Sequence, residues 1–200
     1  MPLIRAVGHF RSLYWQIHED WEAHYRDWTR PGFRALAVHR FGAMLKDRKK
    51  GVLWRLLSML YRSMFRYIRN HYGIELPDTT IVGRRFHIGH QHGIVIHYNS
   101  VFGDDCTVHQ NVTIGESNGR QGEAPKFGNR VIVGAGAAII GKIVIGDDVS
   151  IAPNAIVMTN VPTGTIVCAP PPRLIKLRHR PDQATPLPSG PDQVLLGSKE

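Results

Sequence analysis

A six-residue period in apolar residues dominates this chain after position 73. Each repeat carries an aliphatic or aromatic residue that glycine often follows, as in Val82-Gly83 and Ile88-Gly89, and the longest unbroken run spans residues 127–158. An α-helix cannot keep a period of six on one face, because it turns every 3.6 residues. Short strands that turn a corner every six residues can keep it. The period therefore predicts stacked coils around a continuous apolar column.

Two breaks interrupt the period. Asn99-Ser100-Val101 shifts its phase, and Glu116 to Lys126 is a polar, glycine-rich insertion. A loop that leaves a regular solenoid is a common place for function. We therefore expect the insertion to lie near a functional site.

The 72 residues before the period have a different character. Helix formers dominate them, and the pattern predicts one helix over 34–45, opened by Pro31-Gly32, and another over 52–70. The predicted organisation is a basic helical region over 1–72 and a β-helix over 73–168. A C-terminal extension over 169–200 follows, largely disordered after 180.

The net charge of +9 resides in the first 72 residues, which hold 14 Lys and Arg against 5 Asp and Glu. Four arginines fall on one stripe of the predicted helix over 52–70, and most of its other residues are apolar. They are Arg55, Arg62, Arg66 and Arg69. The pattern favours packing in a bundle or a subunit contact. The alternative is peripheral contact with an anionic membrane.

Other classes of protein receive little support. No nucleic-acid-binding motif accompanies the basic segment, and no apolar run approaches the roughly 18 residues of a membrane span. Since no signal peptide is evident, we expect a cytoplasmic protein, with the inner membrane face as a peripheral alternative. Cys106 and Cys168 have no metal-site spacing, so no metal is expected and both are taken as small apolar fillers.

The stretch 73–176 resembles the serine acetyltransferase branch of the hexapeptide-repeat acyltransferases. The resemblance rests on TIVGRRFHIGH (80–90), FGDDCTVHQNVTIG (102–115) and APKFGNRVIVGAGAAIIGKIVIGDD (124–148). Within that branch it is most similar to O-acetyltransferases of exopolysaccharide synthesis, such as the colanic acid type.

The resemblance implies a left-handed parallel β-helix, a homotrimer with its sites between adjacent β-helices, and acetyl-CoA as the donor. It implies His90 as the general base and Glu75, where the family has Asp, as the carboxylate that orients it. Histidine titrates near neutrality and suits the task of activating a hydroxyl for direct attack on a thioester. The residues implied in acetyl-CoA binding are Gly115, Lys126, Gly134, Ala135, Ala152 and Pro153.

Two positions depart from the serine acetyltransferase pattern. Gly89 stands where the family has Asp, and Ala124 stands where it has a second histidine. Both departures predict an acceptor without an ammonium group, such as a sugar of a surface polysaccharide or its precursor. The chain also ends in Gly-Ser-Lys-Glu, so no docking tail for cysteine synthase is expected. The alternatives are L-serine O-acetylation and, in another class, a non-catalytic scaffold.

Several further residues are candidates around this site. His92 and His109 are the expected acceptor contacts, together with positions 89 and 124. From the helical region, Asp20 and Asp27 are candidates to reach the acceptor. Core packing is expected for three tryptophans, and solvated turns for two acidic pairs. These are Trp15, Trp21 and Trp28, and Asp104-Asp105 and Asp147-Asp148.

Overall fold

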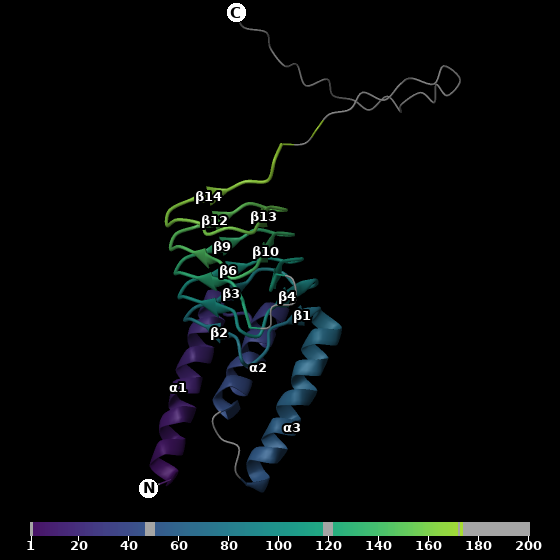
Figure 1. The fold of residues 1–200 in the computed structure, drawn as a ribbon. Coiled ribbons are helices and arrows are strands. Elements are labelled where there is room, and N and C mark those ends of the chain that lie inside the picture. Colours follow the sequence, from purple (N-terminus) through teal and green to yellow (C-terminus); the bar gives the residue numbers. More distant parts are fainter. Residues whose placement is uncertain (1, 47–50, 118–121, 172, 174–200) are drawn as a thin grey trace, which may run out of the picture. The chain divides into compact units, whose positions relative to one another are not determined.

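The computed structural model describes residues 2–46, 51–117, 122–171 and 173, and those up to Pro170 form one compact unit. Three helices precede the strands: α1 (Pro2–Ala23), α2 (Pro31–Lys46) and α3 (Val52–Tyr67) (Figure 1). A π-helical turn, Ile68–Tyr72, extends α3 and ends at Gly73 in the left-handed region, φ 60°. The expected tail after 180 and the C-terminal residues lie outside the described part.

Both predicted helices are present, with shifted ends. Helix α2, predicted over 34–45, starts at Pro31 itself, where the fixed φ of proline suits a first helical position. Within the described residues, no helix combines the length and apolar character that crossing a membrane requires.

Fourteen short strands follow in the described residues, and they pair in parallel as three sheets. Sheet A has the order β1-β4-β7-β10-β13, sheet B β11-β8-β5-β2, and sheet C β14-β12-β9-β6-β3. The expected parallel β-helix is confirmed. The strands are β1 (Ile74–Glu75), β2 (Ile81–Val82), β3 (His87–Ile88), β4 (Ile94–Ile96), β5 (Val101–Phe102), β6 (Thr107–Val108), β7 (Thr113–Gly115), β8 (Lys126–Phe127), β9 (Ile132–Val133), β10 (Ala138–Ile140), β11 (Val144–Ile145), β12 (Ser150–Ile151), β13 (Ile156–Val157) and β14 (Ile166–Val167).

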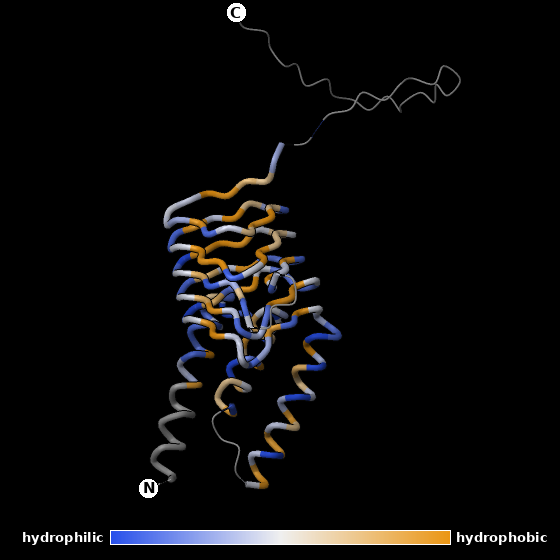
Figure 2. The backbone as a smooth tube through the Cα atoms, viewed as in Figure 1, coloured by the Kyte–Doolittle hydropathy of each residue, from blue (hydrophilic) through white to orange (hydrophobic). Residues whose placement is uncertain are grey.

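The core is the predicted apolar column. In sheet A, Ile114 lies opposite Ile139, which lies opposite Val157, and all three side chains are buried. Figure 2 shows hydrophobic stretches in the coils separated by hydrophilic corners. Burial of such a column, at about 25 cal/mol per Å² of apolar surface, is the main source of stability for strands this short.

The phase shift lies elsewhere than expected. Eight positions separate Ile88 from Ile96 in the first coil, whereas six separate their partners Val108 and Ile114 in the coil above. The two additional residues therefore belong to the corner between β3 and β4, not to Asn99–Val101. This corner carries His90.

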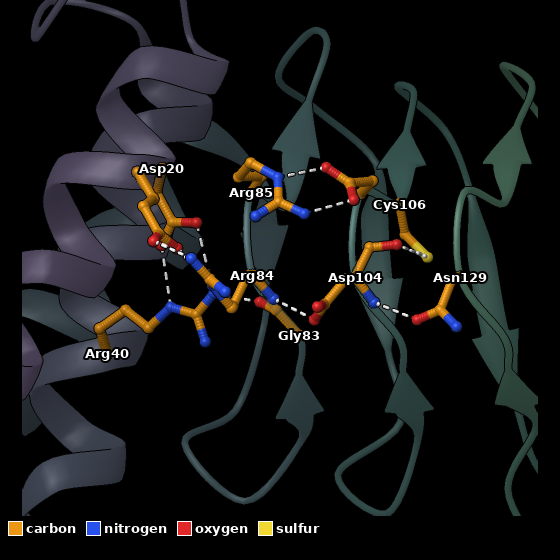
Figure 3. Close-up of polar contacts among 10 residues, drawn as sticks. Asp20, Arg40, Gly83, Arg84, Arg85, Asp104, Cys106 and Asn129 are labelled. Carbon is orange, nitrogen blue, oxygen red and sulfur yellow. Dashed lines mark hydrogen bonds and ion pairs between the residues drawn. The ribbon is translucent and has the colours of Figure 1, made fainter.

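The acidic pairs lie in turns, as expected, and they also link neighbouring coils. Figure 3 shows the link that Asp104 makes. Asp104 accepts a hydrogen bond from the backbone N–H of Arg84 through Oδ1, at 2.8 Å. Its own N–H donates to Asn129 Oδ1 at 2.9 Å in the coil above. Asp105 forms an ion pair with Arg85 beside this ladder.

Helices α1 and α2 cover the open edge of the first coil. The guanidinium of Arg40 donates to the carbonyl oxygens of Val82 (2.6 Å) and Gly83 (2.5 Å), and it pairs with Asp20 at 2.8 Å (Figure 3). Asp20 is fully buried in this contact. It is therefore part of the helix–coil junction and is not available to an acceptor.

Other expectations about burial need correction. Trp15 and Trp28 are 51% and 66% exposed, since both lie on outer faces of the helical region. Cys106 is buried as expected, whereas Cys168 is exposed beyond the last strand. On α3, the leucines Leu53, Leu56 and Leu60 are exposed in the single chain.

Candidate active site

His90 lies at the widened corner of the first coil, directly after β3. Its side chain is exposed. His109 occupies the corresponding corner one coil above, and the two ring centroids are 6.5 Å apart. Two cavities of about 640 and 710 Å³ lie among the helices, away from this corner.

The presence of glycine at position 89 has a local steric explanation. A Cβ at this position would lie 2.6 Å from Nδ1 of His109, well inside van der Waals contact. The glycine therefore leaves room for the His109 imidazole next to His90. An aspartate at position 89 would displace that ring.

Burial keeps the histidines around His90 neutral. His87, half-buried in β3, has its pKa lowered to about 4, mainly by desolvation and then by the nearby His24, His109 and Arg30. Burial also lowers the pKa of His109, with a smaller contribution from His90. Desolvation thus favours the neutral form of His87 and His109.

Glu75 and His92 lie at the same end of the β-helix. Glu75 is partly buried in β1, opposite Val95 of β4, the strand that follows the His90 corner. His92 adopts φ 76°, and its N–H donates to the carbonyl of Tyr72 at 2.8 Å. The structure records no hydrogen bond between Glu75 and His90 among the described residues.

The expected acetyl-CoA residues fall on two different corners. Gly134-Ala135 and Ala152-Pro153 continue the His90 corner through the higher coils, and a Cβ on Gly134 would lie 2.6 Å from the backbone N of Pro153. Gly115 ends β7 and Lys126 starts β8, so they flank the polar insertion at the next corner. Ala124 lies in that insertion and is buried.

The connection between α1 and α2 lies beside His87. Tyr25 meets the His87 ring edge to face at 5.8 Å, and the guanidinium of Arg30 lies 4.7 Å from the Tyr25 ring. Asp27 accepts hydrogen bonds from the N–H (2.9 Å) and hydroxyl (2.6 Å) of Thr29, which lower its pKa and keep it ionised. Asp27 Oδ2 and Arg30 Nε are 3.7 Å apart.

Sequence reasoning included Asp27 but missed Arg30 and His24. Their proximity to β3 depends on how α1 and α2 pack on the coil, which no local pattern reveals. Among the residues that the structure describes, no three His, Cys, Asp or Glu side chains are grouped as a metal site.

Known proteins resemble this chain in both sequence and fold. The serine acetyltransferase of Helicobacter pylori strain 26695 is 39% identical over 136 residues, covering 68% of this chain and 75% of that protein. The serine acetyltransferase of Mycobacterium tuberculosis is 35% identical over 162 residues, covering 80% and 65%. No protein-family model matches the chain.

Solved structures agree with the sequence comparison. Serine acetyltransferase isoform 3 of Entamoeba histolytica, in complex with cysteine, superposes with a TM-score of 0.71 at 25% identity, covering 86% of this chain and 63% of that chain. The soybean serine acetyltransferase apoenzyme gives 0.69 at 25% identity, covering 86% and 72%. This chain belongs to the serine acetyltransferase family. It is therefore an acyltransferase with acetyl-CoA as its co-substrate.

Two expectations fail against these findings. The particular closeness to exopolysaccharide O-acetyltransferases is not supported, and the sugar acceptor is wrong, because these relatives and structures are serine acetyltransferases. The departure at Gly89 has a steric explanation, because the glycine makes room for His109. Ala124 is buried, and nothing in the structure explains the departure at that position.

Proposed function

We propose that this chain is an L-serine O-acetyltransferase that transfers the acetyl group directly from acetyl-CoA to the serine hydroxyl. The observation that carries the proposal is the exposed imidazole of His90 at the corner after β3, in a chain that belongs to this family. An exposed imidazole suits a general base, because it can take up and release a proton.

In the proposed reaction, His90 accepts the hydroxyl proton as the serine oxygen attacks the thioester carbonyl. The new C–O bond forms, the C–S bond breaks, and the CoA thiolate leaves with the proton that His90 returns. Glu75, from β1, is proposed to orient the imidazole and stabilise its charged form. Backbone N–H groups at the corners are suited to stabilise the oxyanion.

Asp27 and Arg30 are proposed to hold the serine backbone. Serine is a zwitterion, so its recognition needs an anion and a cation side by side. Asp27 is ionised and its side chain is 44% exposed, and Arg30 lies 3.7 Å away, near His87 of the strand that leads to His90. We propose that these two side chains of opposite charge bind the ammonium and carboxylate groups of serine.

The donor is proposed to lie along the corner column formed by Gly134-Ala135 and Ala152-Pro153. Gly115, Lys126 and Ala124 lie on the next corner of the same chain. We propose that in a homotrimer this corner packs against the His90 corner of a neighbouring copy. We further propose the left-handed sense of the coil and a cytoplasmic location. Membrane contact by the four arginines of α3 and the π-helical turn stays a prediction, which liposome flotation tests.

A steady-state assay tests the function. We expect L-serine and acetyl-CoA to give O-acetylserine and free CoA. We expect Asp27→Asn to raise KM for L-serine about tenfold or more while KM for acetyl-CoA stays within twofold. Glu22→Gln, an exposed acid on the last turn of α1, is the matched control and should behave as wild type. Absence of O-acetylserine under these conditions would contradict the proposal.

A further inference from the structure

His24 is fully buried between the helices and the first coil, and the proposed chemistry does not use it. It follows α1 directly. Its Nδ1 lies 2.6 Å from the carbonyl oxygen of Asp20, and its Nε2 accepts a hydrogen bond from the backbone N–H of Ile88 at 3.2 Å. One imidazole therefore joins the end of α1 to strand β3.

The two bonds require one neutral tautomer. A carbonyl oxygen only accepts, so Nδ1 carries the proton, and an N–H only donates, so Nε2 is free to accept. The surroundings favour this form. Burial lowers the pKa of His24, and Arg30 and His87 face it, with the His87 ring centroid 4.8 Å away. The nearby carboxylate of Asp20 is occupied by Arg40.

The Ile88 N–H needs a partner because β3 is the edge strand of sheet C. The N–H groups of His87 and Gly89 donate upward, to Cys106 and Val108 in the next coil. The N–H of Ile88, between them, points to the open edge, where only His24 supplies an acceptor among the described residues. An unpaired buried N–H costs about 1–3 kcal/mol.

The two segments that His24 joins are the two sides of the proposed site. Asp27 and Arg30 follow it by three and six residues, and His90 follows Ile88 by two. The α1–α2 connection contacts the coil beside this point, where Tyr25 packs on His87. The distance between the acceptor-binding charges and the base thus depends on this contact.

We propose that His24 is a positioning residue for acetyl transfer, which fixes the segment that carries Asp27 and Arg30 against the strand that leads to His90. This inference rests on the proposed function. His24 touches neither substrate. It sets the separation between the groups that hold the serine and the imidazole that deprotonates it.

Two substitutions separate the two hydrogen bonds. In His24→Gln, the longer amide reaches the place of Nε2 and can still accept from Ile88. In His24→Asn, the shorter amide reaches only the place of Nδ1, so the Ile88 N–H is left unpaired. Tyr61→Phe is the matched control, because Tyr61 on α3 likewise accepts a backbone N–H of the first coil, from Asp78 at 3.2 Å.

We expect His24→Asn to raise KM for L-serine at least tenfold and to lower kcat, with KM for acetyl-CoA within twofold. For His24→Gln, KM for L-serine, kcat and KM for acetyl-CoA should all remain within about threefold of the wild-type values. Tyr61→Phe should change only the melting temperature. A folded His24→Asn enzyme with wild-type serine kinetics would refute the inference, as would equal impairment of the Asn and Gln variants.

Hydrogen exchange keeps the inference testable if His24→Asn does not fold. Peptides covering residues 86–90 should be protected to the same degree in wild type and His24→Gln. Loss of protection in His24→Gln without a change in KM for L-serine would refute the positioning role. If the wild type does not acetylate serine, the proposed function fails instead, and the exchange result still reports on the Ile88 contact.

Discussion

Histidines in three different environments share one end of the β-helix. His90 is exposed, His109 is partly covered, and His24 is fully buried. The degree of burial decides what each can do, because desolvation disfavours the imidazolium. An exposed ring can take up a proton during a reaction, whereas a buried neutral ring serves better as a fixed donor and acceptor.

His90→Ala tests the catalytic assignment directly. Loss of a general base lowers kcat by about 10² or more, so we expect that loss with KM for acetyl-CoA unchanged. Free CoA release, followed continuously, measures it. His71→Ala, an exposed histidine at the end of the π-helical turn, is the control. Wild-type turnover in His90→Ala would show that His90 is not the general base.

Gly89→Ala tests the steric account of the departure from the family pattern. The added methyl would overlap His109 Nδ1 at 2.6 Å, so we expect lower kcat and a lower melting temperature. The double variant Gly89→Ala/His109→Ala removes the overlap and should recover the melting temperature of His109→Ala alone. Additive losses in the double variant would show that the overlap is not the cause.

The candidate residues His90 and Glu75 and the corner positions 134–135 and 152–153 come from the family resemblance, and their roles stay predictions. In the structure they lie at one end or along one corner of the β-helix. Arg30 and His24 could not be found this way, because the strand that they face lies about 60 residues further along the chain. Asp20 resembled a candidate ligand because its partner Arg40 lies on another helix, 20 residues further along the chain.

Helices α1 and α2 act as a cover for the lower edge of the coil. Arg40 donates to the carbonyl of Val82 in β2, and His24 accepts from the N–H of Ile88 in β3. His39 on α2 donates through Nδ1 to the carbonyl of Pro77 at 3.0 Å. Edge strands with free backbone groups invite aberrant pairing. The helical region thus protects the β-helix as well as contributing to the site.

The stability of this cover should depend on pH. Burial lowers the pKa of His39 from 6.5 to about 4, so between these values the unfolded chain binds a proton that the folded chain does not. The contribution of His39 is complete above pH 6.5 and falls as pH decreases to 4, by about 3 kcal/mol in total. Urea unfolding at pH 7.5 and 4.5 measures the loss.

His39→Gln should reduce that pH dependence, because the amide does not titrate. His24, His87 and His109 also have lowered pKa values and keep part of the slope in the variant. An unchanged pH dependence in His39→Gln would contradict the assignment.

At the scale of elements, the period predicted the coils well and the phase shift poorly. Ile94 and Ile96 are both apolar and both buried, so the sequence fits two registers there, and only the pairing with β1 and β7 distinguishes them. Burial of the tryptophans was wrong for a related reason. Apolar character does not say which helix face meets the coil.

For the whole molecule, we expect a mass three times the 22.5 kDa of the chain by light scattering. Mixing inactive variants tests whether sites form between copies. Gly115→Glu should fold, since a Cβ there would meet only Ile140 at 3.6 Å, yet it places a charge on the insertion corner. Co-expression of Gly115→Glu with His90→Ala should restore activity. In mixed trimers, some interfaces combine the intact His90 corner of a Gly115→Glu copy with the intact insertion corner of a His90→Ala copy.

The control for this mixing experiment is Ala135→Glu with His90→Ala. Both changes lie on the same corner, so no mixed interface is intact and activity should stay absent. Recovery in both mixtures, or in neither, would argue against sites shared between copies.

The widened corner between β3 and β4 interrupts regular stacking of the coils, but it carries the proposed general base. A coil with six-residue spacing throughout would stack without interruption, and removal of two residues from this corner would restore that spacing. Such a chain would be the better scaffold, yet it would lose the outward loop that presents His90. A chain selected for stability alone would therefore lose the proposed general base. The two additional residues at this corner are the part of the coil that serves activity at the expense of regular stacking.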